Sequence, residues 1–258
     1  MIVNYKNTPV FYKECGQGQA VVLLHGFLEH SGIWSDLAKT LSKKYRVVCI
    51  DLLGHGNTGC IGYIHTMEDM ANTVHFVLNH LNIQKCTMVG HSMGGYVALA
   101  YAELFPNVLN GLCLMNSTAL NDSIEKQKSR DRAIAAVKQN HKSFIRIAIS
   151  NLFRPKNRKR FSQQIQILKE EALKMSLQGI IAALEGMKIR KNRVQLFQSL
   201  PFKKMLILGR KDPVLEYDTL IEQTKNSNIE LAEFEDGHMS YIENKEEITY
   251  KIMYFIEK

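Results

Sequence analysis

The sequence predicts an α/β fold in which a parallel β-sheet is covered by helices on both faces. Short apolar runs rich in β-branched residues alternate with longer stretches of helical periodicity, and this alternation is typical of βαβ units. The run at 20–25 reads A-V-V-L-L-H, as expected of a strand buried on both faces. A basic stretch, 121–200, interrupts the alternation and predicts an excursion from the sheet.

Each element follows from a local pattern. The first two strands are expected to form a hairpin that turns at Asn7-Thr8. The strands are expected at 2–5, 9–14, 20–25, 46–50, 85–90, 111–116, 203–209 and 229–234. The helices between them are expected at 31–44, 66–82, 92–105, 216–226 and 244–257. Two helices begin with the spacing of a capping box: Thr66 with Asp69, and Asn244 with Glu247.

The basic stretch differs in composition from the rest of the chain. Residues 121–200 carry 18 Lys and Arg against 6 Asp and Glu, whereas the other residues carry 15 against 19. The stretch contains several helical patterns, for example at 134–152. An insertion of this size beside the carboxyl ends of parallel strands would cover the crevice where such sheets bind ligands. We therefore expect a core of residues 1–117 and 201–258 and a basic helical cap of residues 118–200.

The composition excludes disordered, collagen-like and coiled-coil chains. The 258 residues are 45% hydrophobic and 22% charged, with 16 Gly and 5 Pro. Five scattered cysteines without a C-x-x-C pair indicate neither a disulfide framework nor a zinc site, and they favour a reducing compartment. No secretory signal is visible, and the apolar runs are too short to cross a membrane. The sequence thus predicts a cytoplasmic protein with no membrane span and leaves the oligomeric state open.

The strongest chemical motif is a G-x-S-x-G turn between a strand and a helix. The strand at 85–90 runs directly into Gly90-His91-Ser92-Met93-Gly94, and a helix of small residues follows. A nucleophile on such a tight turn has a strained backbone, and glycines on either side let the strand and the helix approach each other. The helix N-terminus also stabilises negative charge beside the serine. Ser92 is therefore the candidate nucleophile.

A serine hydroxyl needs a positioned base, and the base needs an acid that orients it. Asp212 lies in the turn after the strand at 203–209, and His238 lies in the turn after the strand at 229–234. Both turns are at the carboxyl ends of parallel strands, where Ser92 also lies. We therefore predict His238 as the base and Asp212 as the orienting acid.

Other interpretations of these residues remain. An Asp before a Pro is common in plain turns, which could account for Asp212. Asp122 follows the strand at 111–116 and is a rival acid. Asp236 is another carboxylate close to His238, but its position favours a turn or a cap.

The oxyanion of an acyl-transfer reaction needs two N–H donors. We predict the backbone N–H of Met93, directly after the nucleophile, and that of Phe27, because Gly26 lets the loop after the strand at 20–25 turn sharply. Side chains in and after this loop are expected to contact the substrate: Leu28, His30 and Trp34.

Taken in chain order, these motifs resemble those of the α/β-hydrolase superfamily, in particular its capped serine hydrolases. The resemblance covers the chain except the cap and rests on five segments: His25-Gly26-Phe27, Asp51-Leu52-Leu53-Gly54-His55-Gly56, Gly90-His91-Ser92-Met93-Gly94-Gly95, Gly209-x-x-Asp212 and Gly237-His238. The resemblance implies the α/β-hydrolase fold with a mostly parallel eight-stranded sheet, a Ser-Asp-His triad and no cofactor. It does not imply a substrate, because this fold has many activities.

The predicted function is that of a serine hydrolase that cleaves a small carboxylic ester, or a related acyl compound, through an acyl-enzyme on Ser92. Members similar to haloalkane dehalogenases and epoxide hydrolases are excluded, because their nucleophile is Asp. The alternative is a lyase resembling SHCHC synthase that acts on an anionic substrate. That branch commonly carries Arg where this chain has Tyr96. The expected partner is a small-molecule acyl substrate.

Three further patterns are expected to be structural. Residues 54–59 satisfy G-x-G-x-x-G, but no helix follows them as dinucleotide binding requires. The basic run 154–160 is interpreted as a solvated cap loop, so no nucleic-acid partner is predicted. The remaining histidines show no metal-ligand spacing, so no metal site is predicted.

Overall fold

The computed structural model describes residues 1–258 and contains one eight-stranded sheet, in the order β1-β2-β4-β3-β5-β6-β7-β8. The strands are β1 (Ile2–Tyr5), β2 (Thr8–Cys15), β3 (Ala20–Leu24), β4 (Arg46–Ile50), β5 (Cys86–His91), β6 (Leu109–Met115), β7 (Lys203–Gly209) and β8 (Ile229–Phe234). β1 and β2 are antiparallel to their neighbours, and the other six strands are parallel. The predicted α/β fold with a mostly parallel sheet is confirmed.

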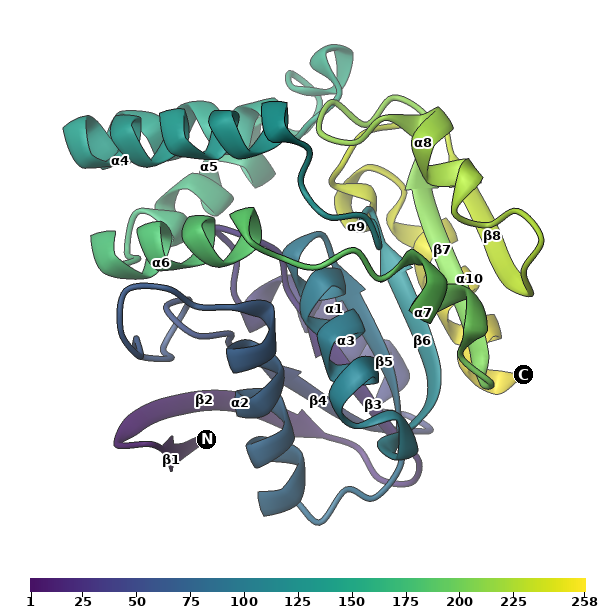
Figure 1. The fold of residues 1–258 in the computed structure, drawn as a ribbon. Coiled ribbons are helices and arrows are strands. Elements are labelled where there is room, and N and C mark those ends of the chain that lie inside the picture. The colour runs from purple at the N-terminus through teal and green to yellow at the C-terminus, as the bar shows by residue number, and fades with distance from the viewer.

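Helices cover both faces of this sheet because its strands are apolar on both sides. In β3, Val21 and Leu23 belong to one apolar cluster, together with residues of α1 and α10, whereas Val22 and Leu24 belong to a second cluster with residues of α2 and α3. The covering helices are α1 (Ser35–Leu41), α2 (Met67–His80), α3 (Met93–Leu104), α8 (Tyr217–Glu222), α9 (Ser240–Glu243) and α10 (Lys245–Glu257). Figure 1 shows α2 and α3 on the near side of the strands.

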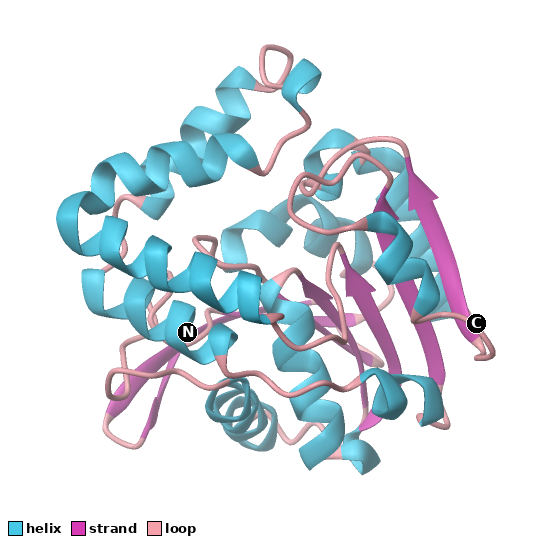
Figure 2. Cartoon of the chain, turned by 45° about the horizontal axis from the view of Figure 1, so that its top comes forward, coloured by secondary structure: helices cyan, strands magenta, loops and turns pink.

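Four further helices, α4 (Ile124–Asn151), α5 (Ser162–Ala172), α6 (Leu177–Lys188) and α7 (Val194–Ser199), lie between β6 and β7 in the chain. We call residues 124–199 the inserted helices. Figures 1 and 2 show α4, α5 and α6 stacked together beyond the ends of the parallel strands, apart from the layers that flank the sheet. The division into a core and a cap at residues 118 and 200 stays a prediction.

The first hairpin differs in one detail from the prediction. The first hairpin turns at Lys6-Asn7, one residue earlier than predicted, because Thr8 already pairs with Tyr5 in the ladder. Both turn residues have positive φ, 49° and 60°, as a two-residue hairpin turn requires.

The two predicted helix caps have different outcomes. The Thr66 side chain accepts a hydrogen bond from the Asp69 N–H, as predicted for the start of α2. The Asn244 side chain does not cap α10, because its Oδ1 accepts no hydrogen bond. Its Nδ2 donates to Asp236 Oδ2 at 3.3 Å and to Glu247 Oε2 at 3.4 Å, so the side chains of the predicted pair meet without forming the cap.

The predicted helix at 134–152 is interrupted. α4 contains a kink at Asn140, where φ is −157° and ψ is 86°. The Asn140 side chain accepts a hydrogen bond from the Ser143 N–H at 3.0 Å and so begins a new helical segment. None of the helices is both long and apolar enough to cross a bilayer.

Candidate active site

The turn that carries Ser92 is strained and tightly packed. Ser92 lies between β5 and α3 with φ 50° and ψ −115°, a backbone conformation that is costly for a residue with a side chain. A Cβ on Gly90 would lie 2.4 Å from the carbonyl oxygen of Gly94, and a Cβ on Gly94 would lie 2.3 Å from that of Leu24. Only glycine therefore lets the strand and the helix pack this closely.

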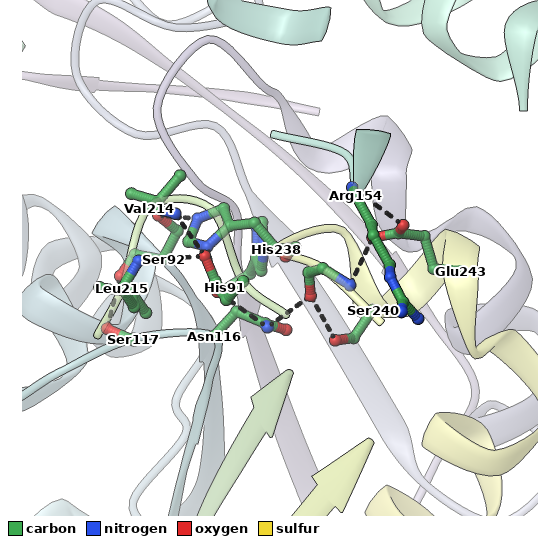
Figure 3. A network of polar contacts seen from close by, with 12 residues as sticks. His91, Ser92, Asn116, Ser117, Arg154, Val214, Leu215, His238, Ser240 and Glu243 are labelled. Carbon is green, nitrogen blue, oxygen red and sulfur yellow. Dashed lines mark hydrogen bonds and ion pairs between the residues drawn. The ribbon is translucent and has the colours of Figure 1, made fainter. Parts of the chain in front are cut away.

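Ser92, His238 and Asp212 form one hydrogen-bonded line. His238 Nε2 lies 2.8 Å from Ser92 Oγ, and His238 Nδ1 lies 2.7 Å from Asp212 Oδ2. Figure 3 shows the Ser92 and His238 side chains facing each other. The side chains of His238 and Asp212 are each only 2% exposed, so water screens their interaction weakly. Three residues that are far apart in the sequence thus meet at the carboxyl ends of the parallel strands β5, β7 and β8.

Asp212 is oriented by its own turn as well as by His238. Its Oδ1 accepts hydrogen bonds from the N–H groups of Val214 at 2.8 Å and Leu215 at 3.1 Å, and its Oδ2 also accepts one from Asn116 Nδ2 at 3.3 Å. Burial alone would raise the pKa of Asp212, but the attraction of His238 and these hydrogen bonds hold it below the ordinary value. The turn-forming role and the contact with His238 are therefore compatible, because they use different oxygens.

The backbone that carries His238 is anchored from three sides. The His238 N–H donates to the carbonyl oxygen of Leu152 in the inserted helices at 3.1 Å. The His238 carbonyl oxygen lies 3.0 Å from His91 Nε2, and Asn116 Nδ2 donates to the carbonyl oxygen of Gly237 at 3.1 Å. Sequence reasoning missed Asn116, because no motif distinguishes it from any other residue at a strand end.

The rival acids are engaged elsewhere. Asp122 is buried and pairs with Arg130 and Arg190, so it makes no contact with His238. Asp236 accepts hydrogen bonds from Arg154 Nη1 at 3.1 Å. Asp122 therefore connects two of the inserted helices or their ends, and Asp236 connects the inserted helices to the core.

The interpretation of residues 154–160 as a solvated loop is wrong for two of its members. Asn157 is buried and donates to Asp236 at 2.9 Å and to Glu243 at 2.8 Å. The Arg154 side chain is 17% exposed, and its backbone N–H donates to Glu243 at 3.3 Å. In Figure 3, Arg154 and Glu243 lie beside the loop of His238. Asp236, in the loop after β8, and Glu243, in α9, attract these groups. The position of these two carboxylates could not be foreseen from the basic run alone.

A buried ion pair lies behind the nucleophile. Glu29 Oε2 lies 2.9 Å from His91 Nδ1, and both side chains are 1% exposed. Glu29 also accepts hydrogen bonds from the Gly26 N–H at 2.6 Å and from the Tyr241 hydroxyl at 3.0 Å. Burial alone would lower the pKa of His91 and raise that of Glu29, but their mutual attraction reverses both shifts. The pair holds the loop after β3 against the G-x-S-x-G turn.

The two predicted oxyanion donors lie on the two segments that this pair connects. Met93 is the first residue of α3, and its N–H has no partner within the helix. The N–H of Phe27 likewise donates no hydrogen bond within the protein. Leu28, next to it, has a positive φ of 63°, so the loop is bent sharply at this point.

The candidate nucleophile, Ser92, lines a small cavity of about 110 Å³. Ser92, His238, Phe27 and Leu28 line it from the core. The inserted helices close it with Lys126, Arg130, Ala148, Leu152 and Met187. Half of the lining residues are hydrophobic, and polar or charged side chains lie among them, as is usual for a small-molecule site.

Two of the residues expected to contact the substrate do not line this cavity. His30 begins the short helix Ser31–Trp34, where its Nδ1 accepts a hydrogen bond from the Gly32 N–H at 3.1 Å. Trp34 is fully buried and packs against the Tyr241 ring, with centroids 6.0 Å apart. Their local contacts therefore place both side chains outside the cavity of Ser92.

No group of three or more His, Cys, Asp or Glu side chains is arranged to hold a metal ion. The G-x-G-x-x-G residues at 54–59 form turns, and the next helix begins only at Met67. The feature that makes a helix N-terminus a dinucleotide site is therefore missing there.

Comparison with known proteins decides the family. The family model of the alpha/beta hydrolase fold matches residues 19–245. The chain belongs to the alpha/beta hydrolase family. This alpha/beta hydrolase is 27% identical to an esterase from Thermogutta terrifontis, with a TM-score of 0.91 over 97% of this chain and 93% of that one. Its fold also matches an enol-lactonase from Burkholderia xenovorans LB400, with a TM-score of 0.92, 19% identity and full coverage of both chains.

Among curated sequences, the alpha/beta hydrolase is 31% identical over 113 residues to an uncharacterized protein of Mycobacterium tuberculosis. The match covers 44% of this chain and 33% of that protein. The chain thus spans about a third of the length of the first curated relatives that it matches.

Proposed function

We propose that the protein is a serine hydrolase that cleaves carboxylic esters through an acyl-enzyme on Ser92. The hydrogen-bonded line from Ser92 through His238 to Asp212, at 2.8 and 2.7 Å, carries the proposal. The esterase of Thermogutta terrifontis, 27% identical over nearly the whole chain, supports the choice of an ester bond.

In this mechanism, His238 Nε2 accepts the Ser92 proton while Ser92 Oγ attacks the ester carbonyl carbon. His238 Nδ1–H donates to Asp212, which stays ionised because its pKa is lowered, and the carboxylate stabilises the imidazolium that forms. The N–H groups of Met93 and Phe27 donate to the developing oxyanion. His238 then protonates the leaving alcohol.

The second half of the reaction uses the same groups. A water molecule gives its proton to His238 and attacks the acyl carbon, and Ser92 leaves with the proton returned from His238. We propose that residues 118–200 act as a cap in both halves. Its side chains close the cavity at Ser92, which excludes bulk water and strengthens the interactions inside.

The proposal is tested by covalent labelling and by turnover. A fluorophosphonate should label the native chain at Ser92, as located by peptide mass spectrometry, and the chain should hydrolyse short p-nitrophenyl esters. Ser92→Ala should abolish labelling and lower turnover by on the order of 10⁶. The control is Ser240→Ala, which changes a buried serine at the start of α9, two residues after His238, and should keep both properties.

Parent-rate hydrolysis by Ser92→Ala, or labelling of a different residue, would reject the assignment. Elimination of an anionic substrate with no acyl-enzyme detectable by mass spectrometry would instead favour the lyase alternative.

A further inference from the structure

Two cations of the inserted helices line the same cavity as the candidate nucleophile. Lys126 and Arg130 lie one helical turn apart on α4, and both line the cavity that contains Ser92 and His238. Lys126 is half-buried, and its Nζ donates to the carbonyl oxygen of Val214 at 2.9 Å. That carbonyl is neutral, so the contact orients the ammonium group without cancelling its charge.

None of the carboxylates that line this cavity is free to pair with Lys126. The only carboxylate that lines it is Glu29, and the buried pair with His91 already balances that charge. Arg130 pairs with Asp122, but Asp122 is shared with Arg190. Three cations therefore surround a single carboxylate.

A second cavity continues the first on the side of these cations. It has a volume of about 220 Å³, and Tyr96, Lys126 and Val214 line both cavities. Arg190 also lines it and lies over the Tyr96 ring, 4.1 Å from the ring centroid. Its carboxylates are Asp122, already paired, and Glu216, which is exposed to solvent. A substrate that extends from Ser92 would thus pass Lys126 on its way into this second cavity.

We propose that Lys126 and Arg130 bind a carboxylate of the substrate, so that the preferred esters are half-esters of short dicarboxylic acids. This inference rests on the proposed ester hydrolysis at Ser92 and names its substrate class. One carboxylate would neutralise the surplus charge and accept charge-assisted hydrogen bonds from both side chains. The scissile carbonyl would lie at Ser92 with the free carboxylate toward α4.

The electrostatics of Lys126 agree with this assignment. Burial, and then repulsion from Arg130, lower the pKa of the Lys126 ammonium. A bound carboxylate would reverse the second effect, because it places an opposite charge beside both cations. The site is therefore arranged to bind an anion more tightly than a neutral group of the same shape.

The test compares esters that differ only in charge. The probes are the monoethyl esters of malonate, succinate and glutarate, each beside the ethyl ester in which the free carboxylate is replaced by a carboxamide. The measured quantity is the ratio of kcat/KM for the acid to kcat/KM for the amide. We expect the native protein to prefer at least one acid by tenfold or more. Lys126→Gln and Arg130→Gln should each lower this ratio about tenfold, mainly through KM.

Lys128→Gln is the matched control, because Lys128 lies on the same helix but is exposed and pairs with Glu125. It should leave the ratio unchanged. The proposal would be overturned if the native protein hydrolysed acid and amide with the same kcat/KM. It would also be overturned if the Lys126 and Lys128 substitutions changed the ratio equally.

A binding measurement separates this inference from the proposed reaction. In Ser92→Ala, calorimetric titration should show the preferred acid binding about tenfold more tightly than its amide, and Lys126→Gln in that background should remove the difference. If the native protein neither hydrolyses esters nor is labelled by fluorophosphonate, the proposed function is rejected. The binding measurement still tests whether the cavity holds an anion site, because it does not depend on turnover. Equal binding of acid and amide rejects the anion site alone.

Discussion

Replacing Asp212 with Asn tests the proposed relay through a change of one atom. Asp212 Oδ1 accepts two backbone N–H groups, and Asn can keep these bonds with its own oxygen. The amide nitrogen then takes the place of Oδ2, which accepts from His238 Nδ1 at 2.7 Å and from Asn116 Nδ2 at 3.3 Å. A donor would face two donors. His238 can relieve its own conflict only by moving its proton to Nε2, and that tautomer cannot accept the proton of Ser92.

The expected loss is about 10⁴ in kcat, or about 5 kcal/mol of transition-state stabilisation. It is measured with p-nitrophenyl acetate near neutral pH, beside urea unfolding to confirm that the variant is folded. The control is Asp236→Asn, which changes the rival acid two residues from His238 and should cost less than tenfold. The relay would be refuted if folded Asp212→Asn kept more than a tenth of the parent kcat, or if both variants lost activity equally.

Asp212→Asn should also change how the unfolding free energy depends on pH. The pKa of Asp212 is lower in the folded protein than its ordinary value of 3.8. Its ionised form therefore contributes stability above pH 3.8, and this contribution is lost as the pH falls through the folded pKa. Asp212→Asn lacks this contribution, so its unfolding free energy should fall less steeply below pH 4 than that of the native protein. Parallel curves would contradict the expected shift.

Three further substitutions probe the support of the site. Gly94→Ala places a Cβ 2.3 Å from the Leu24 carbonyl oxygen and should lower the unfolding free energy by about 3 kcal/mol in urea titrations. Glu29→Gln breaks the buried pair with His91 and should cost roughly 3 kcal/mol. That cost should be largest between pH 4.5 and 6.5. The pKa of Glu29 is lowered by folding, so its carboxylate contributes stability above pH 4.5, and the pKa of His91 is raised by folding, so its imidazolium contributes stability below pH 6.5. A pH-independent cost would contradict the pairing. Asn157→Ala removes one hydrogen-bond donor from each of the Asp236 and Glu243 carboxylates and should cost about 2 kcal/mol in thermal unfolding, whereas an exposed change such as Lys156→Ala should cost nothing measurable.

Much of the fold was predictable because its signals are local. β1, β4, β7 and β8 begin and end at the predicted residues, since apolar runs bounded by turn residues have few alternatives. The glycines around Ser92 by themselves indicate a tight turn. The rule that parallel strands end at one edge of the sheet then placed Asp212 and His238 near Ser92, and the structure has them within hydrogen-bond distance. Their catalytic roles stay predictions.

Features that depend on distant partners were missed or misplaced. The burial of Glu29 beside His91 joins residues 62 positions apart, and neither residue carries a local sign of that contact. Trp34 seemed a candidate substrate contact by its place in the chain, but its ring packs against Tyr241 near the other end of the sequence. Asn157 belongs to a run whose charge suggests exposure to solvent, yet it is buried against Asp236 and Glu243, about 80 residues further along the chain.

The order of strands and helices, the tight turn at Ser92 and the strand ends that carry Asp212 and His238 were determined by sequence alone, because apolar periodicity and glycine placement act over a few residues. How the inserted helices lie across those strand ends was decided only in the tertiary structure. That packing brings Lys126 and Arg130 to the cavity of Ser92. It depends on contacts between segments far apart in the chain, and no local pattern encodes such contacts.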